Sequence, residues 1–415
     1  MVVVKKVIVP ALVLLMAIPI IAGCGNSSSI KEPVKRTAMD YNLEAENSGF
    51  AFGLFQQVAS GDYGTNIVLS PLSAKLALAM TYNGAVGETK DAMAGVLDLE
   101  GMSLEEVNKQ LGNLMTSLAQ ADEDMLLEIA NSLWANQDYE LSQDFVERCR
   151  ESYDAEVANL DFSDPESPDI INAWVKEKTR DKIEKIVDKL TPELALILIN
   201  AVYFNGKWET QFDASLTEDG DFHLLDGGTV SVPLMRRSDE YSYYEDENLQ
   251  AVSLPYGEEE KGRMSMYVVL PREGRDYGEF LSTLSEANWE QWMGMFRNRE
   301  GELALPRFKV EYKKELSDAL KAMGMEPAFH GGLEDIFAGL GGEKAYISKV
   351  LQKTYIDVNE EGTEAAAVTE VEVEVTSVQP DTEPFTMTVD RPFFFAIRDN
   401  QTGALLFMGS IVDPS

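Results

Sequence analysis

Cysteine and histidine are scarce in this chain of 415 residues. The sequence contains only Cys24, Cys149, His223 and His330. Because Cys24 lies in the leader described below, Cys149 has no partner for a disulfide. The Cys/His spacing of a zinc site is absent, and acidic runs such as residues 245–247 lack the ligand spacing of a calcium loop. We therefore expect no metal and no cofactor.

Catalytic motifs are missing as well. The sequence has no Gly-x-Ser-x-Gly nucleophile elbow, no Gly-x-x-x-x-Gly-Lys-Ser/Thr phosphate loop and no His-Glu-x-x-His zinc helix. Neither histidine lies in a recognisable catalytic context, and among 71 acidic residues a carboxylate pair arises by chance. We predict that the chain is not an enzyme.

Positive charge is in deficit. The 35 Lys and Arg residues stand against 71 Asp and Glu, which gives a formal net charge of −36. Nucleic acid needs a basic stripe, and none of the Lys or Arg residues cluster into one, so we expect no nucleic-acid partner. The pattern favours a solvated acidic surface, with a specific cationic partner as the alternative.

The N-terminus carries a hydrophobic run after two lysines. Fifteen residues, Val7 to Ile21, follow Lys5 and Lys6 and are apolar apart from two prolines. This run is shorter than the roughly 20 residues of a membrane-spanning helix. It ends in Ile-Ala-Gly-Cys24, which resembles the lipobox of prokaryotic lipoproteins. The resemblance implies cleavage before Cys24 and a lipid on Cys24, hence export to the cell envelope or cell surface; an uncleaved anchor or an ordinary signal peptide is the alternative.

Composition divides the rest of the chain into a tether and one domain. Residues 25–42 are rich in Ser, Gly, Lys and Pro, and the single domain is predicted over 43–415. Ser70 and Pro71 predict a helix start and Asn83-Gly84 its end. The apolar run 194–204 predicts a strand covered on both faces. Helical patterns come first and most strands later, at 264–270, 355–358, 393–397 and 405–411, so the predicted class is α+β.

Residues 360–377 read EEGTEAAAVTEVEVEVTS. Valine occupies positions 371, 373 and 375 and glutamate positions 370, 372 and 374, the alternation of a half-buried strand. No hairpin turn precedes this strand and no short connection follows it. Such a strand has no obvious neighbour in a sheet.

Four motifs together resemble the serpin family. They begin at Asn66 (NIVLSPLS), Asn200 (NAVYFNGKW), Glu360 (EEGTEAAA) and Arg391 (RPFFF, followed by LFMG), and they follow the family order over nearly the whole domain. The resemblance implies a fold of three β-sheets and eight to nine helices with an exposed reactive loop at about 360–385. It also implies suicide inhibition, in which a serine protease cleaves the loop and is trapped as an acyl-enzyme when the loop inserts into the largest sheet.

The resemblance assigns roles to particular residues. The loop hinge is Glu361, Gly362, Thr363, Glu364, Ala365, Ala366 and Ala367, and small residues there suit entry into a sheet. If every second residue from Thr363 points toward the core when the loop inserts, none of these inward-pointing residues is charged. Family spacing puts the reactive bond at Thr376-Ser377, within about two residues. Ser70, Ser73 and Asn200 match the polar shutter under the sheet opening, Gln352 stands where many members carry a histidine, and Trp208 matches the breach where the loop enters; helix capping by the serines and a core role for Trp208 are the alternatives.

The expected partner is therefore a target serine protease, in a covalent acyl complex with a monomeric inhibitor. No Arg or Lys lies between Glu360 and Asp390, which disfavours trypsin-like enzymes and favours elastase-like or subtilisin-like ones. A non-inhibitory serpin that acts as a binding module at the cell surface is the alternative. Glutamine does not titrate, so Gln352 predicts a shutter with reduced pH sensitivity.

Overall fold

The computed structural model of the chain describes residues 48–119, 125–257, 263–340, 344–363 and 383–415. Internal contacts divide the chain into Met1–Asn42 and Leu43–Ser415, and every described residue belongs to the second unit. Some predicted sites lie outside the described residues: Cys24, the hinge positions Glu364 to Ala367, and the bond between Thr376 and Ser377.

Helices dominate the first part of the domain and strands the second, as the sequence predicts. The helix expected from Ser70-Pro71 ends at Tyr82, with Asn83 as its C-cap. Ser70 is its N-cap residue, but its side chain makes no capping hydrogen bond. The α-helices of the described residues are α1 (Ser48–Asp62), α2 (Pro71–Tyr82), α3 (Gly87–Val96), α4 (Leu104–Ala119), α5 (Gln143–Tyr153), α6 (Ser167–Lys178), α7 (Tyr277–Thr283), α8 (Glu286–Met295) and α9 (Ser317–Leu320).

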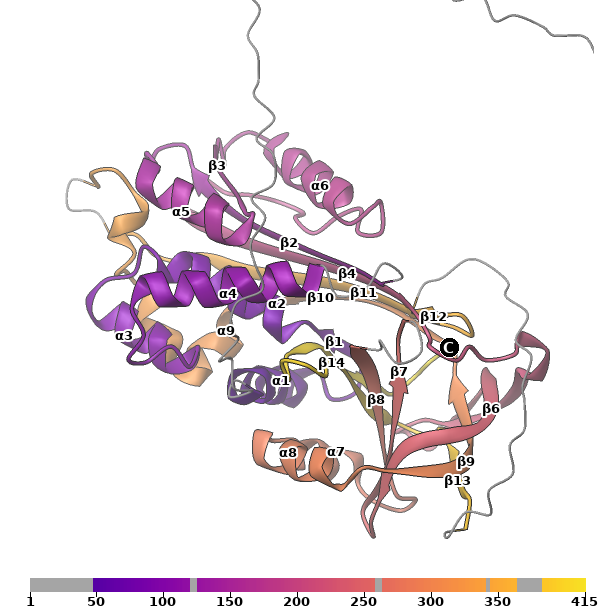
Figure 1. The fold of residues 1–415 in the computed structure, drawn as a ribbon. Helices are drawn as coiled ribbons and strands as arrows, with labels where there is room; N and C mark the ends of the chain where they lie inside the picture. Colours follow the sequence, from indigo (N-terminus) through magenta and orange to yellow (C-terminus); the bar gives the residue numbers. More distant parts are fainter. Residues whose placement is uncertain (1–47, 120–124, 258–262, 341–343, 364–382) are drawn as a thin grey trace, which may run out of the picture. The chain divides into compact units, whose positions relative to one another are not determined.

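A six-stranded sheet contains the apolar run that the sequence predicts as a doubly covered strand. Its order is β10-β11-β12-β4-β2-β3, with β11 also paired to β4. The helices α2 and α6 lie on opposite sides of it (Figure 1). The strands are β2 (Met125–Asn136), β3 (Glu156–Leu160), β4 (Leu196–Lys207), β10 (Phe308–Glu315), β11 (Lys349–Val358) and β12 (Gly362–Thr363).

Alternation along β4 explains why it is apolar almost throughout, with Asn200 the exception between Leu196 and Phe204. Leu196, Leu198 and Val202 join the main core, which includes residues of α2. Ile197 and Ile199 join a second core with residues of α6. Since both faces are covered, the strand has no polar side, which is the arrangement its sequence predicts.

The other strands form a nine-stranded ladder of order β1-β15-β14-β8-β7-β6-β9-β13, with β5 paired to β6. The strand β6 pairs with β9 along residues 234–243 and with β7 along residues 242–245, so it belongs to two layers of strands. Strand pairing among the described residues thus gives two sheets where the resemblance implies three, because β6 joins β5, β9 and β13 to β7 and the rest of the ladder. The strands are β1 (Ile67–Leu69), β5 (Glu218–His223), β6 (Thr229–Glu245), β7 (Leu249–Pro255), β8 (Met264–Pro271), β9 (Arg297–Pro306), β13 (Phe385–Thr388), β14 (Phe393–Asp399) and β15 (Leu405–Ile411).

Candidate functional site

The middle of the six-stranded sheet holds a parallel seam between β4 and β11. Its residue pairs run from Ile197 with Lys349 to Tyr203 with Tyr355. All other neighbours of these two strands are antiparallel to them. Because the two strands are hydrogen-bonded directly to each other, no other strand lies between them along this seam.

Beyond the last pair of the seam, Tyr203 with Tyr355, the two strands separate and β12 lies between them. Gly362 pairs with Lys207 and Thr363 with Gly206 on β4, while Thr363 also pairs with Val358 on β11. The strand β12 is antiparallel to both neighbours, and its label stands at one end of the six-stranded sheet in Figure 1. Two residues of the segment 360–377 thus already form a short strand beyond the Tyr203–Tyr355 end of the seam.

Thr363, the residue from which the alternation was counted, points into the core. It is fully buried, and its hydroxyl lies 2.8 Å from that of Tyr256. The Tyr256 ring stacks on Trp208 with 4.5 Å between ring centroids. Burial raises the pKa of Tyr256. A charged side chain at position 363 would displace this neutral pair from a site without solvent.

Gly362 occupies a backbone position that only glycine fits. Its φ is 154°. A Cβ there would overlap the carbonyl oxygen of Gly206 and the Cα of Lys207. The close approach of β12 to β4 therefore depends on the missing side chain.

A tight turn, residues 359–362, connects β11 to β12. The backbone N–H of Asn359 donates to the carbonyl of Gly362 at 2.9 Å, and that of Gly362 donates to Asn359 at 3.3 Å. Between them the Glu360 carboxylate is 5 % exposed and accepts hydrogen bonds from Arg307 Nε at 2.6 and 2.7 Å and from the Thr217 hydroxyl. Burial alone would raise the pKa of Glu360, but the hydrogen bonds from Arg307 and Thr217 bring it below its ordinary value.

Trp208 lies against this turn. Its indole N–H donates to the carbonyl of Asn359 at 2.9 Å, and its backbone N–H donates to that of Glu361 at 2.9 Å. The ring is 3 % exposed. Trp208 is thus both a core residue and a hydrogen-bond partner of the turn. A core role therefore does not exclude the breach role that the resemblance implies.

The four polar residues expected under the sheet opening come together. Gln352 and Asn200 are cross-strand partners on the seam, and the Gln352 amide donates to Asn200 Oδ1 at 2.6 Å. Gln352 also exchanges hydrogen bonds with the backbone of Ser70, at 3.0 and 2.9 Å. Asn200 donates to the Ser73 hydroxyl and, at 2.6 Å, to Asn131 on β2. Ser70 contacts the seam through its backbone and Ser73 through its hydroxyl. The cluster therefore ties α2 to both seam strands.

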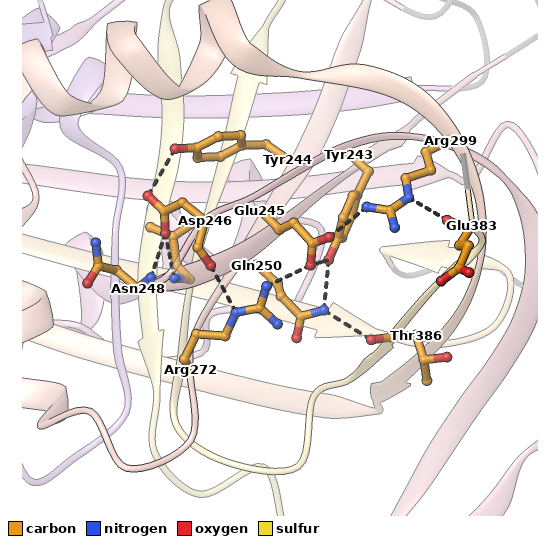
Figure 2. A network of polar contacts seen from close by, with 11 residues as sticks. Tyr243, Tyr244, Glu245, Asp246, Asn248, Gln250, Arg272, Arg299, Glu383 and Thr386 are labelled. Carbon is orange, nitrogen blue, oxygen red and sulfur yellow. Dashed lines mark hydrogen bonds and ion pairs between the residues drawn. The ribbon is translucent and has the colours of Figure 1, made fainter. Parts of the chain in front are cut away.

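The strand β13 follows residues 364–382 in the chain. We call the contacts that hold residues 383–388 to the rest of the domain the clamp. Phe385 stacks on Tyr243 with 3.8 Å between centroids, and a Cβ on Gly301 would overlap its ring. Figure 2 shows the polar part: Gln250 donates to the Thr386 carbonyl at 3.0 Å, and Arg299 donates to that of Glu383 at 2.9 Å. Among the described strands, β13 pairs only with β9, so these contacts hold an edge strand in place.

Glu245 joins the arginines behind the clamp. It accepts hydrogen bonds from Arg272 and Arg299, each at 2.6 Å (Figure 2). Burial acts to raise the pKa of this carboxyl, but the arginine hydrogen bonds leave it lowered. Burial raises the pKa of the neighbouring Tyr243 to about 12, which keeps its hydroxyl neutral beside Gln250.

The sequence profile of the family described as Serpin (serine protease inhibitor) matches residues 45–414. The chain belongs to the serpin family. Among its relatives, a serpin-like protein of Thermococcus kodakarensis is 36 % identical over 375 residues, covering 90 % of this chain and 85 % of the relative. Serpin A3-6 of Bos taurus is 32 % identical over 397 residues, covering 93 % and 92 %.

Solved serpin structures share the fold. The thermophilic serpin tengpin in its native state gives a TM-score of 0.82 at 33 % identity, covering 92 % of this chain and 97 % of that one. The mouse protein-Z-dependent protease inhibitor gives 0.79 at 27 % identity, covering 90 % and 97 %. The serpin fold and the α+β class predicted from the sequence are therefore confirmed.

Several residues of the serpin site were not found from the sequence. Arg307 and Thr217 at the turn, Tyr256 beneath Thr363 and Asn131 at the polar cluster each come from a different part of the chain. None lies in a motif of its own. Only the unusual burial of polar residues could have marked them, and burial is known only once the strands are placed.

Other chemistry is sparse in the part of the chain that the structure describes. It contains no group of three or more His, Cys, Asp or Glu side chains able to hold a metal ion. It also contains no helix long and apolar enough to cross a membrane. Cys149 is a buried free thiol whose pKa is raised by burial to about 12, so it is a poor nucleophile.

Proposed function

We propose that this serpin is a suicide inhibitor of serine proteases. A protease cleaves the loop near Thr376-Ser377, an acyl-enzyme forms, and the freed loop enters the seam between β4 and β11 as a new strand, carrying the protease with it. The observation that carries the proposal is β12. Two residues of the segment already form a strand in the gap above the seam, with Thr363 buried and Gly362 fitted against β4.

The energies favour insertion. Burying the three alternating valines contributes about 5 to 9 kcal/mol, and each new backbone hydrogen bond adds roughly 1 kcal/mol. Repulsion between outward glutamates about 7 Å apart costs only about 0.6 kcal/mol per pair in water before salt screening. A strand of about fourteen residues spans on the order of 45 Å, enough to carry a bound protease across a domain of this size.

The direct test is the formation of an SDS-stable complex. Purified domain is mixed with elastase, subtilisin and chymotrypsin, and the products are separated by SDS gel electrophoresis. We expect a covalent band with at least one of these enzymes. Cleavage of the loop by every enzyme without a covalent band would contradict inhibition and favour the alternative, a non-inhibitory serpin acting as a binding module.

A pair of arginine variants tests the route of insertion. Thr363→Arg brings a charge into a fully buried position, so the loop should be cut without trapping. Thr229→Arg makes the same chemical change at an exposed position on β6 and should trap normally. Equal trapping by both variants would rule out insertion through this gap.

We further propose elastase-like or subtilisin-like targets, because residues 361–389 contain no Arg or Lys for a trypsin-like pocket. Trypsin serves as the comparison enzyme. Its inhibition constant should be at least about 100-fold weaker than that of the preferred enzyme, which corresponds to about 2.7 kcal/mol of discrimination. Inhibition of trypsin at a similar rate would contradict this assignment.

Export and lipid anchoring at Cys24 are a separate proposal, supported by the Lys5-Lys6 start, the apolar run and the Ile-Ala-Gly-Cys ending. Expression in a bacterial host with an alkyne-labelled fatty acid tests it. The full chain should incorporate the label and fractionate with membranes, and Cys24→Ser should do neither. Labelling that survives Cys24→Ser would contradict a lipid at this residue.

A further inference from the structure

Two tyrosines and two lysines lie together at the end of the seam that is next to β12. Tyr203 on β4 and Tyr355 on β11 form the last directly paired residues below β12, and their ring centroids lie 6.4 Å apart. Lys182 Nζ lies 5.9 Å from the centroid of Tyr203 and 5.8 Å from that of Tyr355. Lys309 Nζ lies 5.1 Å from the Tyr355 centroid. One ammonium group therefore contacts rings on both sides of the seam.

Lys182 belongs to a segment that crosses the sheet. This crossing segment, residues 179–195, joins α6 to β4, and its Ile183, Ile186, Val187 and Leu190 pack in the same core as both tyrosines. Its backbone also reaches β11, because Lys353 Nζ donates to the Lys185 carbonyl at 2.7 Å. The segment is thus attached to strands on both sides of the seam.

The register of β12 identifies where an entering strand meets this cluster. Thr363 pairs with Gly206 and Val358, so an antiparallel continuation would bring the third residue after it, position 366, between Tyr203 and Tyr355. Insertion there separates β4 and β11 by two strand spacings, about 9.5 Å in place of about 4.8 Å. The side chain of the inserted residue then lies between the two rings, and one ammonium group can no longer face both.

We propose that Lys182, by contacting Tyr203 and Tyr355 together, is a brake on loop insertion. The double contact exists only while the seam is closed, so it stabilises the uninserted sheet and not the inserted one. Residue 366 is alanine in this chain, which suits a strand that must pass between two aromatic rings. The inference rests on insertion at the seam as part of the proposed function, but it does not depend on trapping a protease.

The test uses a synthetic acetylated peptide with the sequence of residues 363–376 and no protease. Uptake of the peptide by the purified domain is followed by native gel electrophoresis over time. Lys182→Met, which keeps the length of the side chain and removes its charge, should take up the peptide about three- to tenfold faster than the parent. Lys182→Arg keeps the cation over the rings and should be close to the parent rate.

Lys189→Met is the matched control, because Lys189 is an exposed lysine of the same crossing segment. It should leave the uptake rate unchanged. Equal acceleration by both methionine variants would show an effect of net charge or of segment mobility and would overturn the proposal. Failure of parent and variants alike to take up the peptide would overturn it too.

Thermal unfolding supplies a second readout. Lys182→Met should lower the midpoint of the empty domain and leave that of the peptide-loaded domain unchanged, since the double contact is absent from the loaded form. Equal lowering of both midpoints would mean an ordinary structural contact and would overturn the brake. If Lys182→Met fails to fold, Tyr355→Leu removes one of the two rings while keeping an apolar side chain, and the same expectations apply. If uptake accelerates while no protease is trapped, the brake stands and the inhibitory function fails.

Discussion

Neutral hydrogen-bonding side chains close the centre of the seam. The amide of Gln352 can donate and accept at once, and it links Ser70 to Asn200 without a titratable group. A cluster of this kind keeps the same hydrogen bonds across the physiological pH range. The absence of an imidazole from this position has a measurable consequence.

Gln352→His should make the closed seam sensitive to pH. Burial disfavours the charged imidazole, so its pKa in the folded state falls below the unfolded value of about 6.5. Stability is then full above pH 6.5 and decreases as the pH falls below it, because the unfolded chain binds the extra proton. Urea unfolding from pH 8 to pH 5 should show a loss of about 1 to 2 kcal/mol in the variant. A steep transition in the parent over the same range would contradict the role given to Gln352.

Glu360→Gln should loosen the turn that holds β12. The Arg307 side chain is 45 % exposed, so solvent screening limits the loss to roughly 1 kcal/mol. The pKa of Glu360 is lowered, so its contribution is complete above the unfolded value of about 4.3 and is lost as the pH falls through the folded value. The stability difference between parent and variant should therefore be constant from pH 5 to 8 and shrink below about pH 4.

Glu302→Gln is the control for that comparison, since Glu302 is exposed on β9. It should lose little stability at any pH. A difference between parent and Glu360→Gln that persists unchanged at pH 3 would show that the ion pair is not its cause.

A short strand lies on each side of residues 364–382 in the chain. The strand β12 has two residues, and β13 has four and, within the described part of the chain, pairs along one edge only. Neither has enough backbone hydrogen bonds to hold itself, so side chains supply the rest: Thr363 at one end and Phe385 at the other. At β13 the Phe385 ring is the largest buried side chain of the strand and stacks on Tyr243.

Phe385→Ala should release β13. Removing a ring that is 3 % exposed and stacked on Tyr243 costs about 3 kcal/mol, the lower end for a buried phenylalanine. Limited proteolysis should cut the variant at residues 383–388 at least about tenfold faster than the parent. Thr386→Ala changes an exposed side chain of the same strand and should leave the rate unchanged. Slow cleavage of Phe385→Ala would mean that the backbone ladder with β9 suffices.

Elements with a strong period could be predicted from the sequence, and contacts between distant residues could not. The strand β4 was predicted from its apolar run. The Glu360 and Arg307 pair left no trace, because each residue alone resembles any surface charge. The joining of two layers through β6 was also missed, since it depends on where a 17-residue strand changes partners.

At the scale of the molecule, the chain carries a formal net charge of −36, and acidic residues occur along its whole length. Electrostatic attraction to a basic protease should raise the association rate at low salt, and screening limits this effect to about 8 Å at physiological ionic strength. The charge therefore affects how fast a partner arrives. In the proposed mechanism, the state of the sheet determines what happens after cleavage.

Cleavage within the loop should make the whole domain more stable. If the freed strand enters the seam, its apolar burial and hydrogen bonds should raise the thermal midpoint by roughly 10 °C or more in a domain of this size. Scanning calorimetry before and after nicking by a protease that is not trapped measures this directly. A midpoint that stays the same or falls after nicking would show that the strand remains outside the sheet.

The parallel orientation of β4 and β11 has one more consequence. Parallel pairing is slightly less stable per residue than antiparallel pairing, and β12 runs antiparallel to both of these strands. Each residue that followed β12 into the seam would exchange one slanted parallel ladder for two perpendicular antiparallel ones. If the chain inserts as proposed, it would exchange the poorer of two hydrogen-bond patterns for the better one, so strand polarity adds to the burial energy that favours insertion.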